Sequence, residues 1–219
     1  MNTFCINSNM PSVGMSEAIQ QVRDAMRQRG IDAVGQQSQL VVNSDCFVWM
    51  PDSLYEAGLE RQYLGAVCDI PTGTTLYVDH NAQVQAHCIF AVDSTWVNAF
   101  RIAVPGIVIR CQHSLYANEA LFRRSDLKSL VLVQLREGMA DYMVLCNKKL
   151  LLSNTFAATT TEEAVYHALN LSQQLHLAEA DMEVLLCGKV DRPEYGFFAR
   201  FFPKVDLYRE DPLKQAVLV

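Results

Sequence analysis

The sequence predicts an α/β fold in which mixed sheets are flanked by helices and the chain is divided into two halves. In the second half, three short apolar runs joined by turns come before a long amphipathic stretch, and strand-like and helix-like segments alternate after it. In the first half, short apolar runs also alternate with stretches of helical periodicity. Alternation of this kind is typical of a sheet that is covered by helices.

The composition is that of a globular protein with a sizeable core. Of the 219 residues, 50% are hydrophobic and 19% are charged, so disorder is not expected. The net charge is −6, and an acidic chain gains little from the counterion release that drives nucleic-acid binding. We interpret the short basic stretches Arg123-Arg124 and Lys148-Lys149 as solvated or helix-terminal charges. The acidic charge balance therefore predicts no nucleic-acid binding. No apolar run approaches the roughly 20 residues of a membrane helix, so we expect no membrane insertion either.

The cysteine pattern predicts free thiols and a cytoplasmic location. The chain has seven cysteines and no CxxC pair, and most of them lie inside apolar runs, as Cys146 and Cys187 do. Buried free thiols of this kind are typical of a reducing compartment, in contrast to a disulfide framework. The first residues also lack the basic and apolar regions of a signal peptide.

In the first half, apolar spacing and terminating residues define the expected elements. One helix begins at Ser16, which can cap it, and ends before Gly30. A later helix begins after Asp93-Ser94. In chain order we expect a strand at 4–7, a helix at 16–29, strands at 40–42 and 46–50, a helix from 52 or 53 to 64, strands at 75–78 and 83–92 around a turn at 79–81, a helix at 94–103, a strand at 107–111 and a helix at 114–124.

The polar pair Ser125-Asp126 is the expected boundary, which gives halves of residues 1–125 and 126–219. Beyond it we expect strands at 130–135, 140–146 and 150–156, a helix at 160–176, a strand at 183–187, a helix after Asp191 and a strand at 204–208. A capping box, either Thr159 with Glu162 or Thr160 with Glu163, starts the first of these helices, and the sequence leaves its register open.

Two features favour binding over catalysis. The helix through Tyr195–Phe202 is aromatic on several faces, so it is buried in the core, which we favour, or against a partner. The apolar tail Ala216–Val219 either completes a sheet internally or presents an edge strand to another subunit.

Five stretches resemble an uncharacterised bacterial family of unknown function that has a divergent actin-like ATPase (ribonuclease-H-like) fold. They are Leu145–Phe156, Thr160–Glu163, Leu185–Gly188, Val48–Tyr55 and Ile89–Val92. The resemblance spans most of the chain. It implies two ribonuclease-H-like halves related by the actin-like duplication, the first of them degenerate, and a relation to actin-like proteins of pili and secretion systems.

The resemblance also implies where a nucleotide would bind. Actin-like ATPases hold phosphates on the backbone amides of strand–turn–strand loops that contain an aspartate and a glycine. The second-half loop keeps Gly138 but has Gln134 or Arg136 at the aspartate position, and Glu137 offers a carboxylate that we expect to face solvent. The adenosine-side strand would end at Gly188, with one of its paired glycines replaced. Glu137, Gly138 and Gly188 are therefore the candidate cofactor-binding residues of degenerate nucleotide loops, and no cofactor is expected.

The remaining residues predict neither a catalytic nor a metal site. Ribonuclease-H chemistry needs clustered carboxylates, but we interpret Asp141 as an exposed strand residue and Glu162-Glu163 as helix N-terminal charges. His87 and Cys88 are adjacent, so on a strand they point to opposite faces, and the histidines lack metal-ligand spacing to any cysteine. We expect a non-catalytic actin-like interaction or assembly module that binds a protein partner or forms a homodimer. The alternative is a weak nucleotide-binding regulatory switch.

Overall fold

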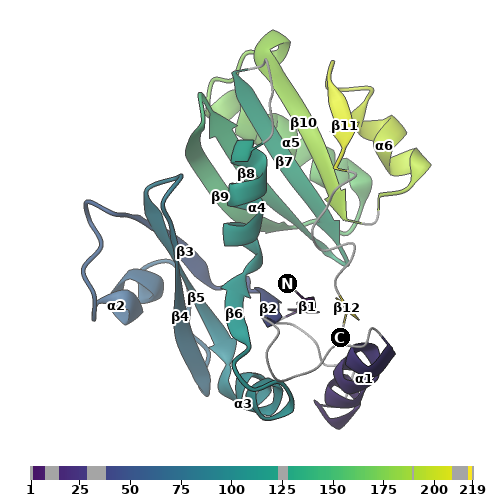
Figure 1. Cartoon of the computed structure of the whole chain (residues 1–219). Helices are drawn as coiled ribbons and strands as arrows, with labels where there is room; N and C mark the ends of the chain where they lie inside the picture. The colour runs from purple at the N-terminus through teal and green to yellow at the C-terminus, as the bar shows by residue number, and fades with distance from the viewer. Residues whose placement is uncertain are drawn as a thin grey trace. The chain divides into compact units, whose positions relative to one another are not determined.

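The computed structural model describes residues 2–7, 15–28, 38–122, 128–188, 190–208 and 217–218 (Figure 1). The chain forms two compact units. Unit 1 comprises Met1–Leu115 with Gln215–Val219, and unit 2 comprises Tyr116–Lys214. The boundary that we predicted between residues 125 and 126 lies outside the described residues and remains a prediction.

Unit 1 contains a parallel sheet in which strands from both ends of the chain meet. Its order is β12-β1-β2-β6, and every neighbouring pair is parallel. The strands are β1 (Asn2–Asn7), β2 (Ser38–Asn43), β6 (Val108–Cys111) and β12 (Val217–Leu218). All six residues of β2 are buried, as is usual for parallel strands that are covered on both faces. The C-terminal tail therefore pairs with β1 of its own chain.

A second, antiparallel sheet in unit 1 has the order β3-β5-β4. Its strands are β3 (Phe47–Pro51), β4 (Thr74–Asn81) and β5 (Ala86–Asp93). The turn that we expected at 79–81 is wrong, because β4 continues to Asn81 and the chain turns at 82–85. The Asn81 side chain stabilises that turn by accepting hydrogen bonds from the backbone N–H groups of Gln83 and Val84. This register places His80 directly opposite His87.

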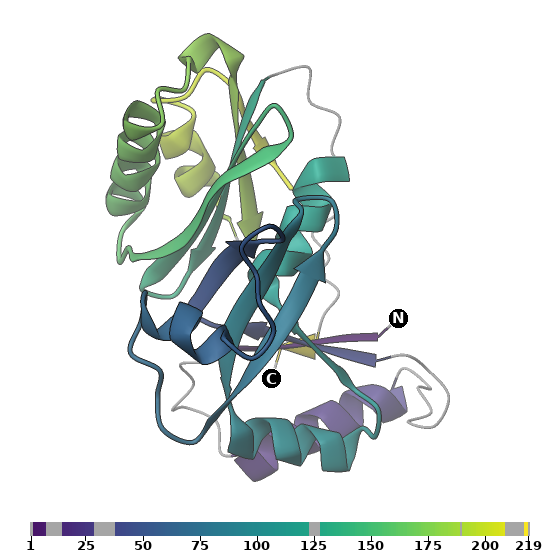
Figure 2. The ribbon, with the colours of Figure 1, turned by 90° about the vertical axis from the view of Figure 1, so that its left-hand side faces the viewer.

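Among the described residues, the helices α1 (Met15–Gln28), α2 (Glu60–Gly65) and α3 (Ser94–Ala103) belong to unit 1. Helix α4 (Gln112–Phe122) follows β6 and contains the boundary between the two units. Helix α3 begins where predicted, since the Asp93 carboxylate accepts hydrogen bonds from the N–H groups of Thr95 and Trp96. Helices α1 and α3 lie side by side (Figure 2). Helix α2 is shorter than predicted. Gly58, with a φ of 96°, interrupts the segment that precedes it.

The antiparallel sheet of unit 1 is covered on both faces. One face packs against the parallel sheet and α3 in a core that contains Leu40, Phe90, Phe100 and Ile109. The other face packs against the segment that contains α2, where Leu64 packs with Ile89 and Ala91 of β5. A disulfide joins Cys46 to Cys68 across this second layer, which corrects the prediction that the cysteines are free thiols. Cys88, Cys111, Cys146 and Cys187 form no disulfide, and all but Cys146 are buried.

Unit 2 has the element order that the sequence predicted. Its strands are β7 (Ser129–Arg136), β8 (Met139–Cys146), β9 (Lys149–Ala157), β10 (Met182–Gly188) and β11 (Val205–Leu207). Helix α5 (Thr161–Gln174) follows β9, the 3₁₀ turn Glu179–Asp181 precedes β10, and α6 (Arg192–Phe198) lies between β10 and β11. The sheet order is β11-β10-β7-β8-β9, with parallel pairing around β10 and antiparallel pairing from β7 to β9. The sheet is therefore mixed.

Capping boxes start both helices of unit 2. Thr160 and Glu163 form the box of α5, which settles the register that the sequence left open, and Asp191 forms that of α6 with Glu194. Figure 2 shows both helices on the same face of the sheet. Phe198 and Phe202 are buried in the core beneath them, so core burial of the aromatic helix is confirmed.

No helix among the described residues is both long and apolar enough to cross a membrane.

Candidate functional site

The three residues predicted from the nucleotide loops lie at one end of the sheet in unit 2. Glu137 and Gly138 form the turn between β7 and β8, and Gly188 ends β10. In the β10–β7 register, Gly188 pairs with Leu135, two residues before Glu137. The structure therefore brings the two glycines and the carboxylate to the same end of neighbouring strands, although they are up to 51 positions apart in the sequence.

The two glycines differ in the space around them. Gly138 has a φ of 70°, and nothing lies within 4 Å of the position that a Cβ atom would take. Gly188 has a φ of 85°, and a Cβ atom there would lie 3.2 Å from the carbonyl oxygen of Leu135. The backbone conformation and this close approach explain the glycine at 188 without a ligand. Gly138, by contrast, leaves the turn open.

A buried ion pair lies directly beside this turn. Arg136 donates from Nε to Oδ2 and from Nη2 to Oδ1 of Asp141, each over 2.7 Å. Thr155 Oγ1 donates a third bond, also 2.7 Å, to Asp141 Oδ1. The Arg136 and Asp141 side chains are only 7% and 3% exposed. Asp141 is thus not the exposed strand residue that we predicted, because a buried carboxylate is tolerated when a guanidinium and a hydroxyl satisfy its oxygens.

The chemistry available at the turn follows from these contacts. Glu137 is exposed, as predicted. The aspartate position of an actin-like phosphate loop would place a carboxylate at residue 134 or 136 for Mg²⁺. Gln134 and Arg136 occupy these positions, and the Arg136 cation is paired with Asp141. The turn therefore offers backbone amides and one solvent-facing acid.

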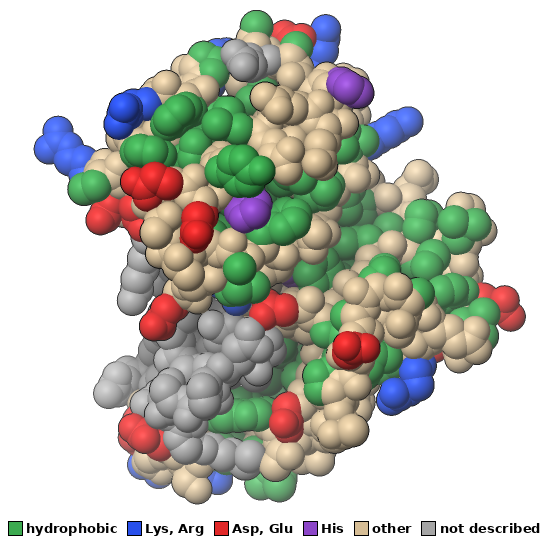
Figure 3. Space-filling view, turned by 180° about the vertical axis from the view of Figure 1, so that it is seen from behind, with side chains coloured by type: hydrophobic (Ala, Val, Ile, Leu, Met, Phe, Trp, Pro, Cys, Tyr) green, Lys and Arg blue, Asp and Glu red, His purple; other side chains and the backbone are tan. Residues whose placement is uncertain are grey.

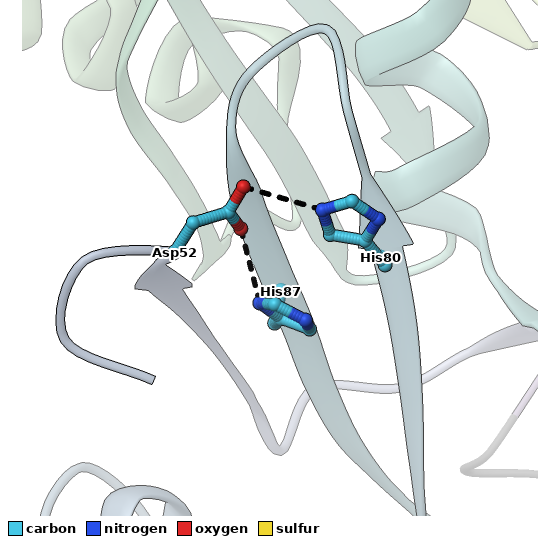
Figure 4. A group of neighbouring side chains, drawn as sticks. All are labelled: Asp52, His80 and His87. Carbon is cyan, nitrogen blue, oxygen red and sulfur yellow. Dashed lines mark hydrogen bonds and ion pairs between the residues drawn. The ribbon is translucent and has the colours of Figure 1, made fainter. Parts of the chain in front are cut away.

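Among the described residues, a group of side chains with metal-ligand geometry lies in unit 1 and consists of Asp52, His80 and His87 (Figure 4). His80 and His87 face one another from β4 and β5, and Asp52 follows the last residue of β3. Asp52 Oδ2 lies 3.3 Å from His80 Nε2, and Asp52 Oδ1 lies 3.1 Å from His87 Nδ1. The three ligand atoms all lie within 4.8 Å of one another.

Sequence reasoning missed this cluster because it assigned His80 to a turn. In the structure the buried residues Asp79 and Asn81 enclose the exposed His80 on β4, but all three are polar, so the sequence shows no alternation there. A strand that continues to Asn81 would have predicted the pairing of the two histidines. The prediction that His87 and Cys88 point to opposite faces is confirmed, since Cys88 lies in the core on the other side of the sheet.

Large apolar side chains also reach the surface of unit 2, and the space-filling view shows hydrophobic groups at the surface between polar ones (Figure 3). Leu151 on β9 is 46% exposed, Tyr166 on α5 is 64% exposed and Phe201 after α6 is 44% exposed. Strand β9 lies at the end of its sheet.

Comparison with known proteins identifies a family and a fold. A family model described as "Protein of unknown function (DUF3822)" matches residues 15–205. A protein from Bacteroides thetaiotaomicron, with an actin-like ATPase fold and unknown function, superimposes with a TM-score of 0.75 at 16% identity, over 90% of this chain and 78% of that chain. A structure of the PilM-PilN type IV pilus biogenesis complex gives a TM-score of 0.52 at 11% identity, over 92% of this chain and 76% of that chain. No curated protein matches the sequence significantly.

Proposed function

This chain belongs to the DUF3822 family and has an actin-like ATPase fold. From that premise we propose that it is a non-catalytic interaction or assembly module whose nucleotide loops are degraded. The observation that carries the proposal is the buried ion pair between Arg136 and Asp141 beside the turn at Glu137 and Gly138.

The ion pair opposes nucleotide binding in two ways. The position of the carboxylate that holds Mg²⁺ in an actin-like phosphate loop is occupied by Gln134 or by Arg136, whose guanidinium is held in the pair. Releasing Asp141 to serve as that carboxylate would also leave the Arg136 charge buried without its partner, at a cost of about 3–5 kcal/mol. Binding of ATP with Mg²⁺ would have to offset this cost before it contributed any affinity.

Strand β9 supports the interaction role. It is a nine-residue strand at the end of the sheet, and such an edge can pair with a strand of another chain. Leu151 adds exposed apolar area on the same strand. We propose that the partner is a protein, which includes a second copy of this chain. The structural neighbour PilM is itself described in a complex with PilN.

Calorimetric titration with ATP and Mg²⁺ tests the proposal. We expect no saturable heat in the micromolar range. A micromolar affinity that is lost in Gly138→Val would overturn the pseudo-enzyme assignment. Gly106→Val is the matched control, because Gly106 lies in unit 1, has a φ of 81° and, like Gly138, has open space around its Cβ position.

The second candidate function is a weak nucleotide-binding regulatory switch. The openness of Gly138 favours it, because the backbone amides of that turn can be approached by an anion. For such a switch, Glu137→Ala and Gly138→Val would each weaken nucleotide binding, with Gly188 contributing only to the shape of the sheet edge.

The proposal includes the organisation into two ribonuclease-H-like halves, residues 1–125 and 126–219, with a degenerate first half. The antiparallel β7–β8–β9 strands with parallel β10 support the assignment of the second half. In the first half β1 pairs in parallel with β2, so these two strands do not form the antiparallel hairpin that a phosphate loop needs. A cytoplasmic location also belongs to the proposal. The buried thiols of Cys88, Cys111 and Cys187 support it, whereas the Cys46–Cys68 disulfide opposes it, because such bonds are typical of oxidising compartments.

A further inference from the structure

We propose that Asp52, His80 and His87 form a binding site for a divalent transition-metal ion of the Zn²⁺ class (Figure 4). The site lies in unit 1 and shares no residue with the nucleotide loops. Its test is therefore independent of the test of the function proposed above.

The distances match those between ligands of one metal ion. With metal–ligand bonds of about 2.0–2.1 Å, two ligand atoms of a tetrahedral zinc ion are separated by roughly 3.3 Å. One oxygen of Asp52, Oδ2, lies 3.3 Å from His80 Nε2, and the other, Oδ1, lies 3.1 Å from His87 Nδ1, so the carboxylate faces both imidazoles. All three ligand atoms lie within 4.8 Å of one another, so a small rotation of one exposed imidazole brings them around a single ion.

An unsatisfied nitrogen points to a missing ligand. His87 Nδ1 is buried and, within the described part of the chain, makes no hydrogen bond of acceptable geometry, although it lies 3.1 Å from a carboxylate oxygen. A buried polar atom without a hydrogen-bond partner is unfavourable. A cation between His87 Nδ1 and Asp52 Oδ1 would accept a lone pair from each and remove that cost.

The backbone of the antiparallel sheet fixes the three ligands. His80 and His87 form a directly opposed cross-strand pair, so their side chains share one face. Met50 pairs with His87, and Asp52, two residues further on, continues on that same face. The Asp52 N–H donates to the Gln85 carbonyl over 2.9 Å, which holds the acid beside the hairpin after β3 has ended.

A second layer of contacts orients the His87 ring. The Tyr55 ring stacks on it with centroids 3.8 Å apart and planes 13° apart. Tyr55 is held in turn by the bond that its hydroxyl donates to Glu60 over 2.7 Å, and Glu60 also accepts from the N–H of Gly58. Supporting contacts of this kind orient the ligands of metal sites and contribute to their affinity.

The donor set selects the class of metal. Two imidazole nitrogens and one carboxylate suit Zn²⁺, Fe²⁺, Co²⁺ or Ni²⁺, whereas Mg²⁺ and Ca²⁺ prefer oxygen ligands. The His80 and Asp52 side chains are 49% and 41% exposed, so a fourth coordination position faces solvent. Three protein ligands with an open position are typical of catalytic zinc sites, and the open position would take water or a side chain of a partner.

Titration of chelator-treated protein with Zn²⁺, followed by calorimetry, tests the site. The Cys146→Ser background removes the one described free thiol that is not buried. We expect one ion per chain and an affinity at least about tenfold weaker in His87→Ala and in Asp52→Asn. His80→Gln is the variant that keeps the fold, because His80 is half exposed on β4. His176→Asn is the matched control, since His176 is exposed and asparagine tolerates its φ of 52°.

Substitution with Co²⁺ supplies a second readout. Visible absorption bands of tetrahedral or five-coordinate cobalt should appear in the Cys146→Ser protein and in His176→Asn, and should be lost in His80→Gln. The proposal is overturned if Zn²⁺ fails to bind at micromolar concentration, or if the affinity is unchanged in His80→Gln and His87→Ala. In that case Asp52 pairs with His80 and His87 and the three residues bind no metal ion.

Discussion

Arg136 and Asp141 form a buried bidentate ion pair, with both hydrogen bonds 2.7 Å long, across the β7–β8 hairpin. The two residues are five positions apart on neighbouring antiparallel strands. In the function proposed above, this pair satisfies the charges of the hairpin internally, so that they are not available to a nucleotide.

The first prediction concerns this ion pair. Asp141→Asn should lower the free energy of unfolding by about 3–5 kcal/mol, because it leaves the Arg136 charge buried without a carboxylate. Urea denaturation monitored by circular dichroism measures the change. The double variant Arg136→Met with Asp141→Leu should recover most of the loss, and Asp69→Asn, at an exposed position, should change stability by less than about 0.5 kcal/mol. A similarly small effect in Asp141→Asn would show that the pair contributes nothing.

The disulfide between Cys46 and Cys68 gives a second prediction. It closes a loop with a sequence separation of 22 residues, so Cys46→Ser with Cys68→Ser should lower the free energy of unfolding by about 2–4 kcal/mol. Cys146→Ser is the control, because that thiol is free and partly exposed. Alkylation of the unreduced, unfolded protein should leave Cys46 and Cys68 unmodified. Modification of both would mean that the bond is absent in the protein as isolated.

Tyr142 provides a test of the core of unit 2. Its hydroxyl donates to the Ala164 carbonyl over 2.8 Å and thereby ties β8 to α5. Burial, with a smaller contribution from the neighbouring Asp141 charge, raises the pKa of Tyr142. Tyr142→Phe should cost about 1 kcal/mol of stability, while Tyr166→Phe, on an exposed side chain, should be close to neutral. Equal denaturation midpoints for the two variants would contradict this assignment.

Asp79 should make unit 1 sensitive to pH. The carboxylate accepts hydrogen bonds from the Cys111 N–H over 2.7 Å and from Arg110 over 3.1 Å, yet burial raises its pKa above the ordinary value. A carboxyl whose pKa is higher in the folded state adds stability below its unfolded pKa of about 3.9 and loses it as the pH rises through the folded pKa. The hydrogen bonds from Cys111, Arg110 and Ser114 each lower the pKa of Asp79, but the effect of burial is larger.

The measurement is the denaturation midpoint as a function of pH for the wild type and Asp79→Asn. The wild type should lose stability, relative to the variant, as the pH rises from about 3.9 into the range of the raised pKa. Parallel curves for the two proteins would show that Asp79 titrates alike in the folded and unfolded states.

Much of the fold could be predicted because its signals are local. The elements of unit 2 come from apolar runs separated by turn residues, and the caps Asp93 and Asp191 lie where the sequence placed them. The turn after β4 could not be placed in this way. Asp79 and Asn81 are polar, and their burial depends on hydrogen bonds that backbone N–H groups donate to them. Cys111 donates to Asp79, and Gln83 in the following turn donates to Asn81. Polar residues in a strand were therefore interpreted as a turn.

The site depended on contacts that no local pattern carries. Asp141 was predicted to be exposed because the sequence does not show that Arg136 lies diagonally across the hairpin. The Cys46–Cys68 bond requires the path of the chain through α2, and the His80–His87 pair requires the register of β4 and β5. In each case tertiary pairing determines whether a polar or reactive side chain is buried, bonded or exposed.

The most direct test of the degraded nucleotide loop is thermal denaturation with saturating ATP and Mg²⁺. A ligand present at 100 times its dissociation constant stabilises a protein by about 2.7 kcal/mol, which for a chain of this size raises the melting temperature by roughly 5–10 °C. Our account predicts a change within about 1 °C of zero for the wild type, Gly138→Val and Gly106→Val alike. A rise of several degrees in the wild type and in Gly106→Val that is absent in Gly138→Val would contradict it.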